Sequence, residues 1–136
     1  MLSLPGGIKA LPLICYEAIF PAMMEIAGER GDLLLNVTND DWFGNSPGPY
    51  QHLRQAQLRA VETRLPLLRS ANSGISTVIA PDGVFNQLLP LDEKGLINAR
   101  LPLKMAPETT YEKRELNFWL FFAIMVLLGI FSRFGK

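Results

Sequence analysis

Residues 11–17, LPLICYE, constrain the fold more than any other stretch, because an apolar run ends there on the only cysteine of the chain. The run predicts a buried strand over 8–14, and the apolar spacing after it predicts a helix over 18–30. A thiol at such a junction faces the positive end of the helix dipole, which favours thiolate and hence a nucleophile. A small buried core residue is the alternative, since free cysteines are often buried. The position of the cysteine alone does not decide between a nucleophile and a core residue.

The rest of the chain up to residue 103 alternates between predicted strands and helices. We predict a helix over 50–64 and strands over 33–38, 67–71, 75–80, 84–89 and 95–103. This order favours a layered α/β sheet with helices on one face and antiparallel pairing among the later strands. We therefore expect a domain over 1–103, with a polar linker over 104–115.

The C-terminal region is strongly apolar. Residues 118–131, FWLFFAIMVLLGIF, carry no charge, and extension to 116–134 admits only Asn117, Ser132 and Arg133 as polar residues. At about 1.5 Å per residue, this longer stretch is just sufficient to cross a bilayer. We therefore predict a transmembrane helix over 116–134, with a buried helix of a water-soluble protein as the alternative. Basic residues flank the stretch equally, so charge gives no orientation.

Composition excludes several classes of function. The 13 basic and 13 acidic residues balance, and no basic stripe with interleaved aromatic residues is present, so we expect no nucleic-acid partner. One cysteine excludes an internal disulfide, and with a single histidine it leaves no metal-ligand spacing. We predict neither a metal site nor a cofactor.

Cys15 has polar neighbours that a catalytic thiol can use. A carboxylate beside a thiol disfavours the thiolate, so Glu17 suits a general-base or substrate-orienting role, or simply a first-turn position on the helix dipole. Tyr16 either donates a hydrogen bond into the site or packs against it.

A second group of candidates follows the strand predicted over 33–38. The turn NDDWFG carries Trp42 and Phe43 at a strand end, where open α/β sheets bind ligands. These two rings either line an apolar substrate channel or hold the loop against the domain. His52 is a conceivable base for Cys15, but its place on a helix rich in Gln and Arg favours a structural role.

The blocks LPLICYEAIFP, NDDWFG, GPYQH and APDG together resemble the apolipoprotein N-acyltransferases of the nitrilase, or carbon–nitrogen hydrolase, superfamily. The resemblance runs from Leu11 to Lys136. It implies an α/β fold: the C-terminal half of a nitrilase-like α-β-β-α sandwich, followed by one transmembrane helix. It also implies a bacterial inner-membrane enzyme, with the catalytic part periplasmic and the C-terminus cytoplasmic.

The resemblance further implies a reaction and roles for particular residues. The family transfers a fatty acyl chain from a phospholipid to the N-terminal diacylglyceryl-cysteine of an apolipoprotein through a cysteine thioester. Cys15 is then the nucleophile and Glu17 a second catalytic residue. Tyr16, Trp42 and Phe43 then contact the lipid substrates.

The sequence departs from the superfamily pattern upstream of the cysteine. The superfamily places a glutamate and a lysine there, whereas no carboxylate precedes Cys15 and the only preceding lysine is Lys9. We therefore expect this chain to be an incomplete portion that is inactive alone. Two alternatives stay open: a hydrolase acting on small amides or nitriles, and a non-enzymatic membrane-anchored remnant.

Overall fold

The computed structural model describes residues 1–26, 31–106 and 110–134. Strands are β1 (Leu2–Ser3), β2 (Lys9–Ile14), β3 (Leu33–Asn39), β4 (Leu67–Asn72), β5 (Ser76–Ile79) and β6 (Phe85–Leu89). Helices are α1 (Ala22–Ile26), α2 (Gly48–Thr63) and α3 (Thr110–Phe134), with 3-10 helices at Pro5–Gly7, Cys15–Ile19 and Asp41–Phe43. The chain forms two compact units, Met1–Ala106 and Pro107–Lys136.

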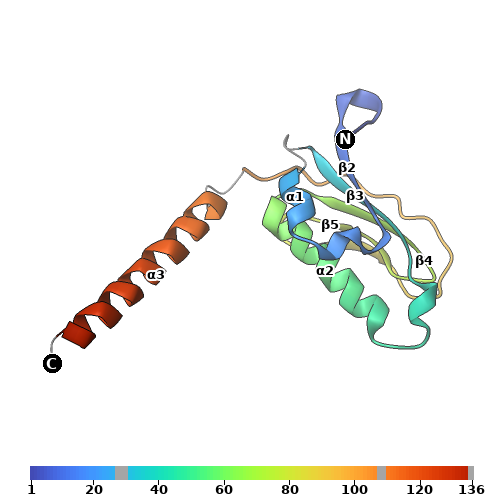
Figure 1. Cartoon of the computed structure of the whole chain (residues 1–136). Coiled ribbons are helices and arrows are strands. Elements are labelled where there is room, and N and C mark those ends of the chain that lie inside the picture. The colour runs from blue at the N-terminus through green and yellow to red at the C-terminus, as the bar shows by residue number, and fades with distance from the viewer. Residues whose placement is uncertain (27–30, 107–109, 135–136) are drawn as a thin grey trace. The chain divides into compact units, whose positions relative to one another are not determined.

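The described strands form one mixed sheet in the order β1-β2-β3-β4-β5-β6 (Figure 1). Strands β2, β3 and β4 are parallel, while β1, β5 and β6 each pair antiparallel with a neighbour. The predicted α/β class and the antiparallel pairing of the later strands are therefore confirmed. The domain boundaries that we predicted at 103 and 115 stay predictions.

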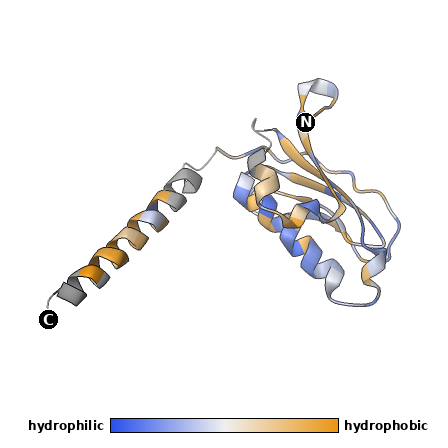
Figure 2. Cartoon of the chain, in the orientation of Figure 1, coloured by the Kyte–Doolittle hydropathy of each residue, from blue (hydrophilic) through white to orange (hydrophobic). Residues whose placement is uncertain are grey.

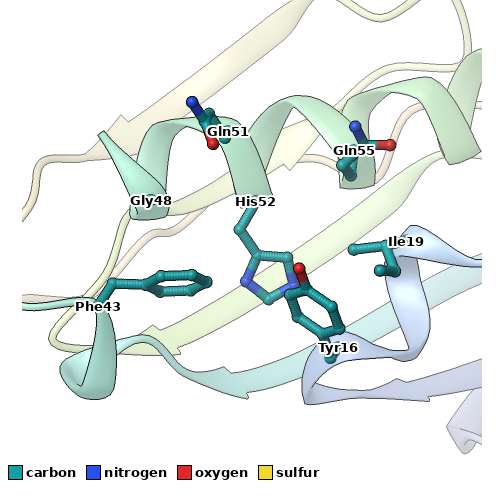
Figure 3. Close-up of a pocket in the computed structure, with 7 residues that line it drawn as sticks. All are labelled: Tyr16, Ile19, Phe43, Gly48, Gln51, His52 and Gln55. Atoms are coloured by element: carbon teal, nitrogen blue, oxygen red, sulfur yellow. The ribbon is translucent and has the colours of Figure 1, made fainter. Parts of the chain in front are cut away.

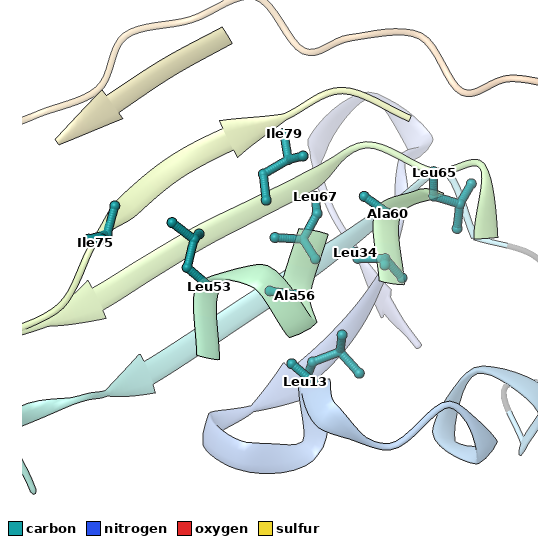
Figure 4. Close-up of a cluster of buried hydrophobic side chains, with 10 residues drawn as sticks. Leu13, Leu34, Leu53, Ala56, Ala60, Leu65, Leu67, Ile75 and Ile79 are labelled. Atoms are coloured by element: carbon teal, nitrogen blue, oxygen red, sulfur yellow. The ribbon is translucent and has the colours of Figure 1, made fainter. Parts of the chain in front are cut away.

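The core lies between the sheet and helix α2. Leu34, Leu67 and Ile79 are partners in adjacent strands and present one apolar row, against which Leu53 and Ala56 of α2 pack (Figure 4). The exposed side of α2 is mostly hydrophilic (Figure 2), as expected for a helix that buries one stripe.

Two residues further along β3 and β4, the same face of the sheet becomes polar. Leu13, Asn36 and Arg69 are partners across β2, β3 and β4, and Asn36 and Arg69 are buried. Because side chains alternate along a strand, this row lies on the α2 side of the sheet, toward the carboxyl ends of the parallel strands. Those ends are where open α/β sheets bind ligands.

The helix predicted over 18–30 is wrong in its first part. A 3-10 helix covers Cys15–Ile19, and α1 begins only at Ala22. Pro21 separates the two, because proline disfavours a helical conformation in the residue before it, here Phe20. Residues 27–30 lie outside the described residues.

The strand predicted over 95–103 is also wrong. This segment carries no secondary structure, and Leu96 and Leu103 are 91% and 89% exposed. A strand needs a hydrogen-bonded neighbour, and the pairs of the described sheet do not include this segment.

The C-terminal prediction is corrected as well. A helix does form, but it begins at Thr110, within the predicted linker, and its side chains over 116–130 are exposed. Among the described residues, no helix has the length and apolarity that crossing a membrane requires. The uncharged run from Phe118 to Phe131 is itself shorter than the about 20 residues that a bilayer demands. The predicted transmembrane helix over 116–134 is therefore not supported.

Candidate active site at the carboxyl ends of the parallel strands

Cys15 lies directly after β2, where the chain turns sharply. Its φ angle is +50°, in the left-handed region that non-glycine residues seldom adopt, and its side chain is partly buried. The residue opens a five-residue 3-10 helix rather than a long α-helix, so the helix dipole that we expected to favour the thiolate is largely missing. Strain of this kind persists only where the surrounding structure enforces it.

Hydrogen bonds from both sides enforce the turn at Cys15. The amide of Ile14 donates to Oε2 of Glu17 over 2.7 Å. From the neighbouring strand β3, Nδ2 of Asn36 donates to the carbonyl of Leu13 at 2.9 Å and lies 3.5 Å from the carbonyl of Cys15. Glu17 and Asn36 thus fix the backbone on either side of the thiol.

A buried polar network lies beneath this turn. Arg69 donates to Oδ1 of Asn36, to Oδ2 of Asp40 at 2.6 Å and, through Nε, to the carbonyl of Ile75 at 3.3 Å. Oδ1 of Asp40 is 3.1 Å from the Thr38 hydroxyl, which donates to it. The same oxygen is 2.9 Å from Nδ1 of His52. The side chains of Asp40 and Arg69 are fully buried, so the network connects the sheet, the turn after β3 and helix α2.

The charges of Asp40 and Arg69 in this network stabilise each other. Burial opposes ionisation of Asp40, but the hydrogen bond from His52, the positive charge of Arg69 and the hydroxyl of Thr38 together hold the pKa of Asp40 below its usual value. Burial lowers the pKa of Arg69, against the opposing effects of Asp40 and of a Cys15 thiolate. An arginine nevertheless remains protonated in a protein, so the positive charge of Arg69 acts on Cys15.

Aromatic rings from two 3-10 helices, Cys15–Ile19 and Asp41–Phe43, gather beside His52. Tyr16 lies edge-on to Trp42 with ring centroids 5.9 Å apart, and Trp42 stacks on Phe43 at 4.2 Å. The His52 ring lies between Tyr16 and Phe43, at 5.4 and 5.8 Å (Figure 3). Trp42 is 64% exposed, so the cluster presents an apolar surface to solvent next to the cysteine turn.

The structure thus brings together the residues singled out from the sequence. Trp42 contacts both Tyr16 and Phe43, and Glu17 braces the turn of Cys15. Their assigned roles in substrate binding and catalysis stay predictions. Lys9 lies at the opposite end of β2, about 20 Å from Cys15 at about 3.3 Å per residue, so it cannot serve the thiol.

Sequence reasoning missed Asn36, Asp40 and Arg69. A signal was present, because Asn36 interrupts the apolar run LLLNV and Arg69 follows the run LPLL. A polar residue inside a predicted buried strand needs a buried partner, and two such residues in adjacent strands can supply each other. Within the described part of the chain, no group of His, Cys, Asp and Glu side chains is arranged to hold a metal ion.

Comparison with known proteins shows which family this chain belongs to and which proteins it is similar to. Residues 1–111 match the family described as Carbon-nitrogen hydrolase. The chain is similar to the apolipoprotein N-acyltransferase of Sinorhizobium medicae, with 48% identity over 99% of this chain and 25% of the relative. It is also similar to the apolipoprotein N-acyltransferase of Allorhizobium ampelinum, with 47% identity over 99% of this chain and 26% of the relative. The chain therefore spans about a quarter of the length of these relatives.

Among solved structures, the chain is similar to a C145A mutant of the Nesterenkonia AN1 amidase from the nitrilase superfamily. That match has 27% identity and a TM-score of 0.49, and it covers 64% of this chain and 36% of the amidase chain. The TM-score is low, so nothing about the site follows from this likeness.

Proposed function

Because this chain belongs to the carbon–nitrogen hydrolase family, we propose that it is the part of an apolipoprotein N-acyltransferase that carries the cysteine nucleophile, Cys15. The observation that carries the proposal is the 48% identity with a protein of that name over 99% of this chain. Support also comes from the strained turn that presents Cys15 beside an exposed aromatic cluster, which suits a thiol that meets apolar acyl chains.

In the proposed reaction, the Cys15 thiolate attacks the ester carbonyl of a phospholipid. A carbon–sulfur bond forms and the ester carbon–oxygen bond breaks, so a lysophospholipid leaves as an alcohol after taking up a proton. The α-amine of the diacylglyceryl-cysteine of an apolipoprotein then attacks the thioester. An amide forms, the amine loses a proton, and the thiolate is released.

The other predicted site residues fit supporting roles in this reaction. Glu17 is already bonded to the Ile14 amide, so we assign it the positioning of Cys15 rather than proton transfer. Tyr16, Trp42 and Phe43 form the surface for the acyl chain. We infer that the complete enzyme works at a bacterial inner membrane, where its phospholipid donor and apolipoprotein acceptor meet, with this part on the periplasmic side.

The chain alone should not complete the reaction. The sequence before Cys15 holds no carboxylate to act as a base, and Lys9 is too distant to stabilise the tetrahedral oxyanion. We expect the purified 136-residue chain to show no acyl transfer, and the missing base and oxyanion donor to come from the three quarters of the relatives that it does not match.

A chimera tests the proposal. This chain replaces the matching quarter of the Sinorhizobium medicae relative, and the purified protein is incubated with phospholipid vesicles and analysed by intact-mass spectrometry. We expect an acyl adduct that maps to Cys15, is cleaved by hydroxylamine as a thioester, and disappears when a lipoprotein peptide with an N-terminal diacylglyceryl-cysteine is added.

The Cys15→Ala chimera is the matched control and should carry no adduct. A folded, monodisperse chimera that forms no adduct, under conditions in which the parent enzyme forms one, would contradict the proposal. Hydrolysis of a small amide by that same chimera would instead support the alternative of a carbon–nitrogen hydrolase.

A further inference from the structure

The single histidine of the chain has one paired and one unpaired ring nitrogen. Nδ1 of His52 lies 2.9 Å from Oδ1 of Asp40. Nε2 is buried and has no hydrogen-bond partner, and the whole residue is only 2% exposed. A buried polar atom without a partner is rare and calls for an explanation.

The network around Asp40 determines which nitrogen carries the proton. Asp40 accepts hydrogen bonds from Arg69 and Thr38, and these contacts favour its ionised form. An ionised carboxylate can only accept, so the proton of His52 must reside on Nδ1. The contact of Nδ1 with Arg69 is longer, at 3.3 Å, and does not compete. In the neutral ring Nε2 is therefore a hydrogen-bond acceptor.

His52, which carries this acceptor, is one of the residues that line a cavity of about 270 Å³. The lining residues share the absence of charge: Tyr16, Ile19, Phe43, Gly48, Gln51, His52 and Gln55 (Figure 3). The negative charge of Asp40 behind the imidazole is balanced by the positive charge of Arg69. The cavity thus offers one buried acceptor, two carboxamides and two aromatic rings, but no charge to bind an ion.

We propose that this cavity is a binding site for a neutral hydrogen-bond donor, a hydroxyl or an amide N–H, which pairs with Nε2 of His52. The donor enters between the rings of Phe43 and Tyr16. Tyr16 is 43% exposed and packs against the imidazole, so its ring is the cover that moves aside. The site lies next to the cysteine turn because Tyr16 follows Cys15 directly.

Two components of the proposed reaction carry such a donor, and this assignment rests on the proposed function. One is the hydroxyl that the phospholipid glycerol gains when its acyl chain leaves. The other is a peptide N–H of the acceptor. Glycerol and N-methylacetamide reproduce these two donors as small probes, and ethylammonium represents the cation that an uncharged cavity should not select.

The experiment is a nitrogen NMR titration of the full chain in mild detergent, with ¹⁵N-labelled histidine. Because the chain has one histidine, the ring signals need no assignment to a residue, only to Nδ1 or Nε2. In the free chain we expect the Nδ1–H form with Nε2 unprotonated. Glycerol, N-methylacetamide or both should shift the Nε2 signal in a saturable way, while ethylammonium should not.

A glycine substitution tests the cavity itself. A Cβ at Gly48 would lie 2.3 Å from Cδ1 of Phe43, so Gly48→Ala must displace a ring that lines the cavity. We expect the same histidine tautomer but at least about threefold weaker binding of the effective probe, which is about 0.6 kcal/mol. Gly129→Ala, in the other unit, is the matched control and should bind as the wild type does.

Several outcomes would overturn the inference. These are an Nε2–H form in the free chain, an Nε2 signal that neither probe shifts, or equal binding by the Gly48→Ala chain. A shift by glycerol alone identifies the lipid hydroxyl as the ligand, and a shift by the amide alone identifies the peptide. The titration does not involve acylation, so a chimera without an acyl adduct and a chain without probe binding are separate failures.

Discussion

Replacement of Arg69 by methionine should destabilise the Met1–Ala106 unit strongly. The guanidinium is fully buried and donates to Asn36, Asp40 and the carbonyl of Ile75. Methionine fills much of its volume but leaves Asp40 as a buried charge without its cation. Breaking a buried ion pair in this way costs about 3–5 kcal/mol. The orphaned Asn36 oxygen adds about 1 kcal/mol or more.

The expected loss is a large fraction of the about 5–15 kcal/mol that stabilises a typical domain. Urea unfolding of the full chain in mild detergent, followed by circular dichroism, measures it. Arg54→Met is the matched control, because Arg54 is exposed and donates to Gln57 on the surface of α2. We expect that control to remain within about 0.5 kcal/mol of the wild type.

A double variant separates lost charge pairing from lost packing. Asp40→Asn removes the carboxylate charge while an amide oxygen remains for His52. If the buried charge causes the loss, Asp40→Asn combined with Arg69→Met should be more stable than the sum of the single losses by about 1–3 kcal/mol. A loss below about 1 kcal/mol for Arg69→Met, or strict additivity in the double variant, would refute this reasoning.

Three further expectations concern the same region. Because the pKa of Asp40 is lower in the folded than in the unfolded chain, its ionised form stabilises the fold above about pH 4, and this contribution is lost as the pH falls through the folded value. Acid unfolding followed by circular dichroism should therefore begin at a higher pH in the wild type than in Asp40→Asn, once each is normalised to its own neutral stability. A Cβ at Gly74 would meet Oδ2 of Asp40 at 2.6 Å, so Gly74→Ala should cost about 1–3 kcal/mol in urea unfolding, whereas Gly129→Ala, where a Cβ meets nothing within 4 Å, should cost nothing. Because Cys15 has a positive φ, Cys15→Gly should be about 1 kcal/mol more stable than Cys15→Ala, and equal urea midpoints would show that the turn is not strained.

Local sequence patterns predicted those helices and strands whose formation depends on the spacing of apolar residues within the element itself. The apolar run at 33–38 forms β3, and the helical spacing after Pro49 forms α2, because each pattern matches the one face that the element buries. The segment 95–103 shows the limit of this reasoning. Its composition suits a strand, yet whether a strand forms depends on a distant hydrogen-bonding partner that no local pattern specifies.

The same limit explains which residues of the candidate site could be predicted from the sequence. Cys15, Tyr16 and Trp42 were identified from two short motifs, and the turn geometry brings these motifs together. The supporting network was not identified, because the contacts of Arg69 with Asn36 and Asp40 form only through the register of the parallel strands β3 and β4. Sequence spacing alone does not reveal that register.

The mixed topology of the sheet also determines when the cysteine site can exist during folding. Strands β4, β5 and β6 pair as neighbours along the chain, with Leu67 opposite Ile79, whereas β3 reaches β4 only across the whole of α2, with Leu34 opposite Leu67. Closing a long loop costs more entropy than closing a short one, so local pairing precedes distant pairing.

The antiparallel meander should therefore assemble before β2 docks, and the turn at Cys15 should be among the last features to form. Substitutions in β5 should slow refolding, while Leu13→Ala should mainly accelerate unfolding. Pulsed alkylation of the single thiol during refolding can follow that final step directly. An equal effect of Leu13→Ala on both rates would place β2 docking earlier.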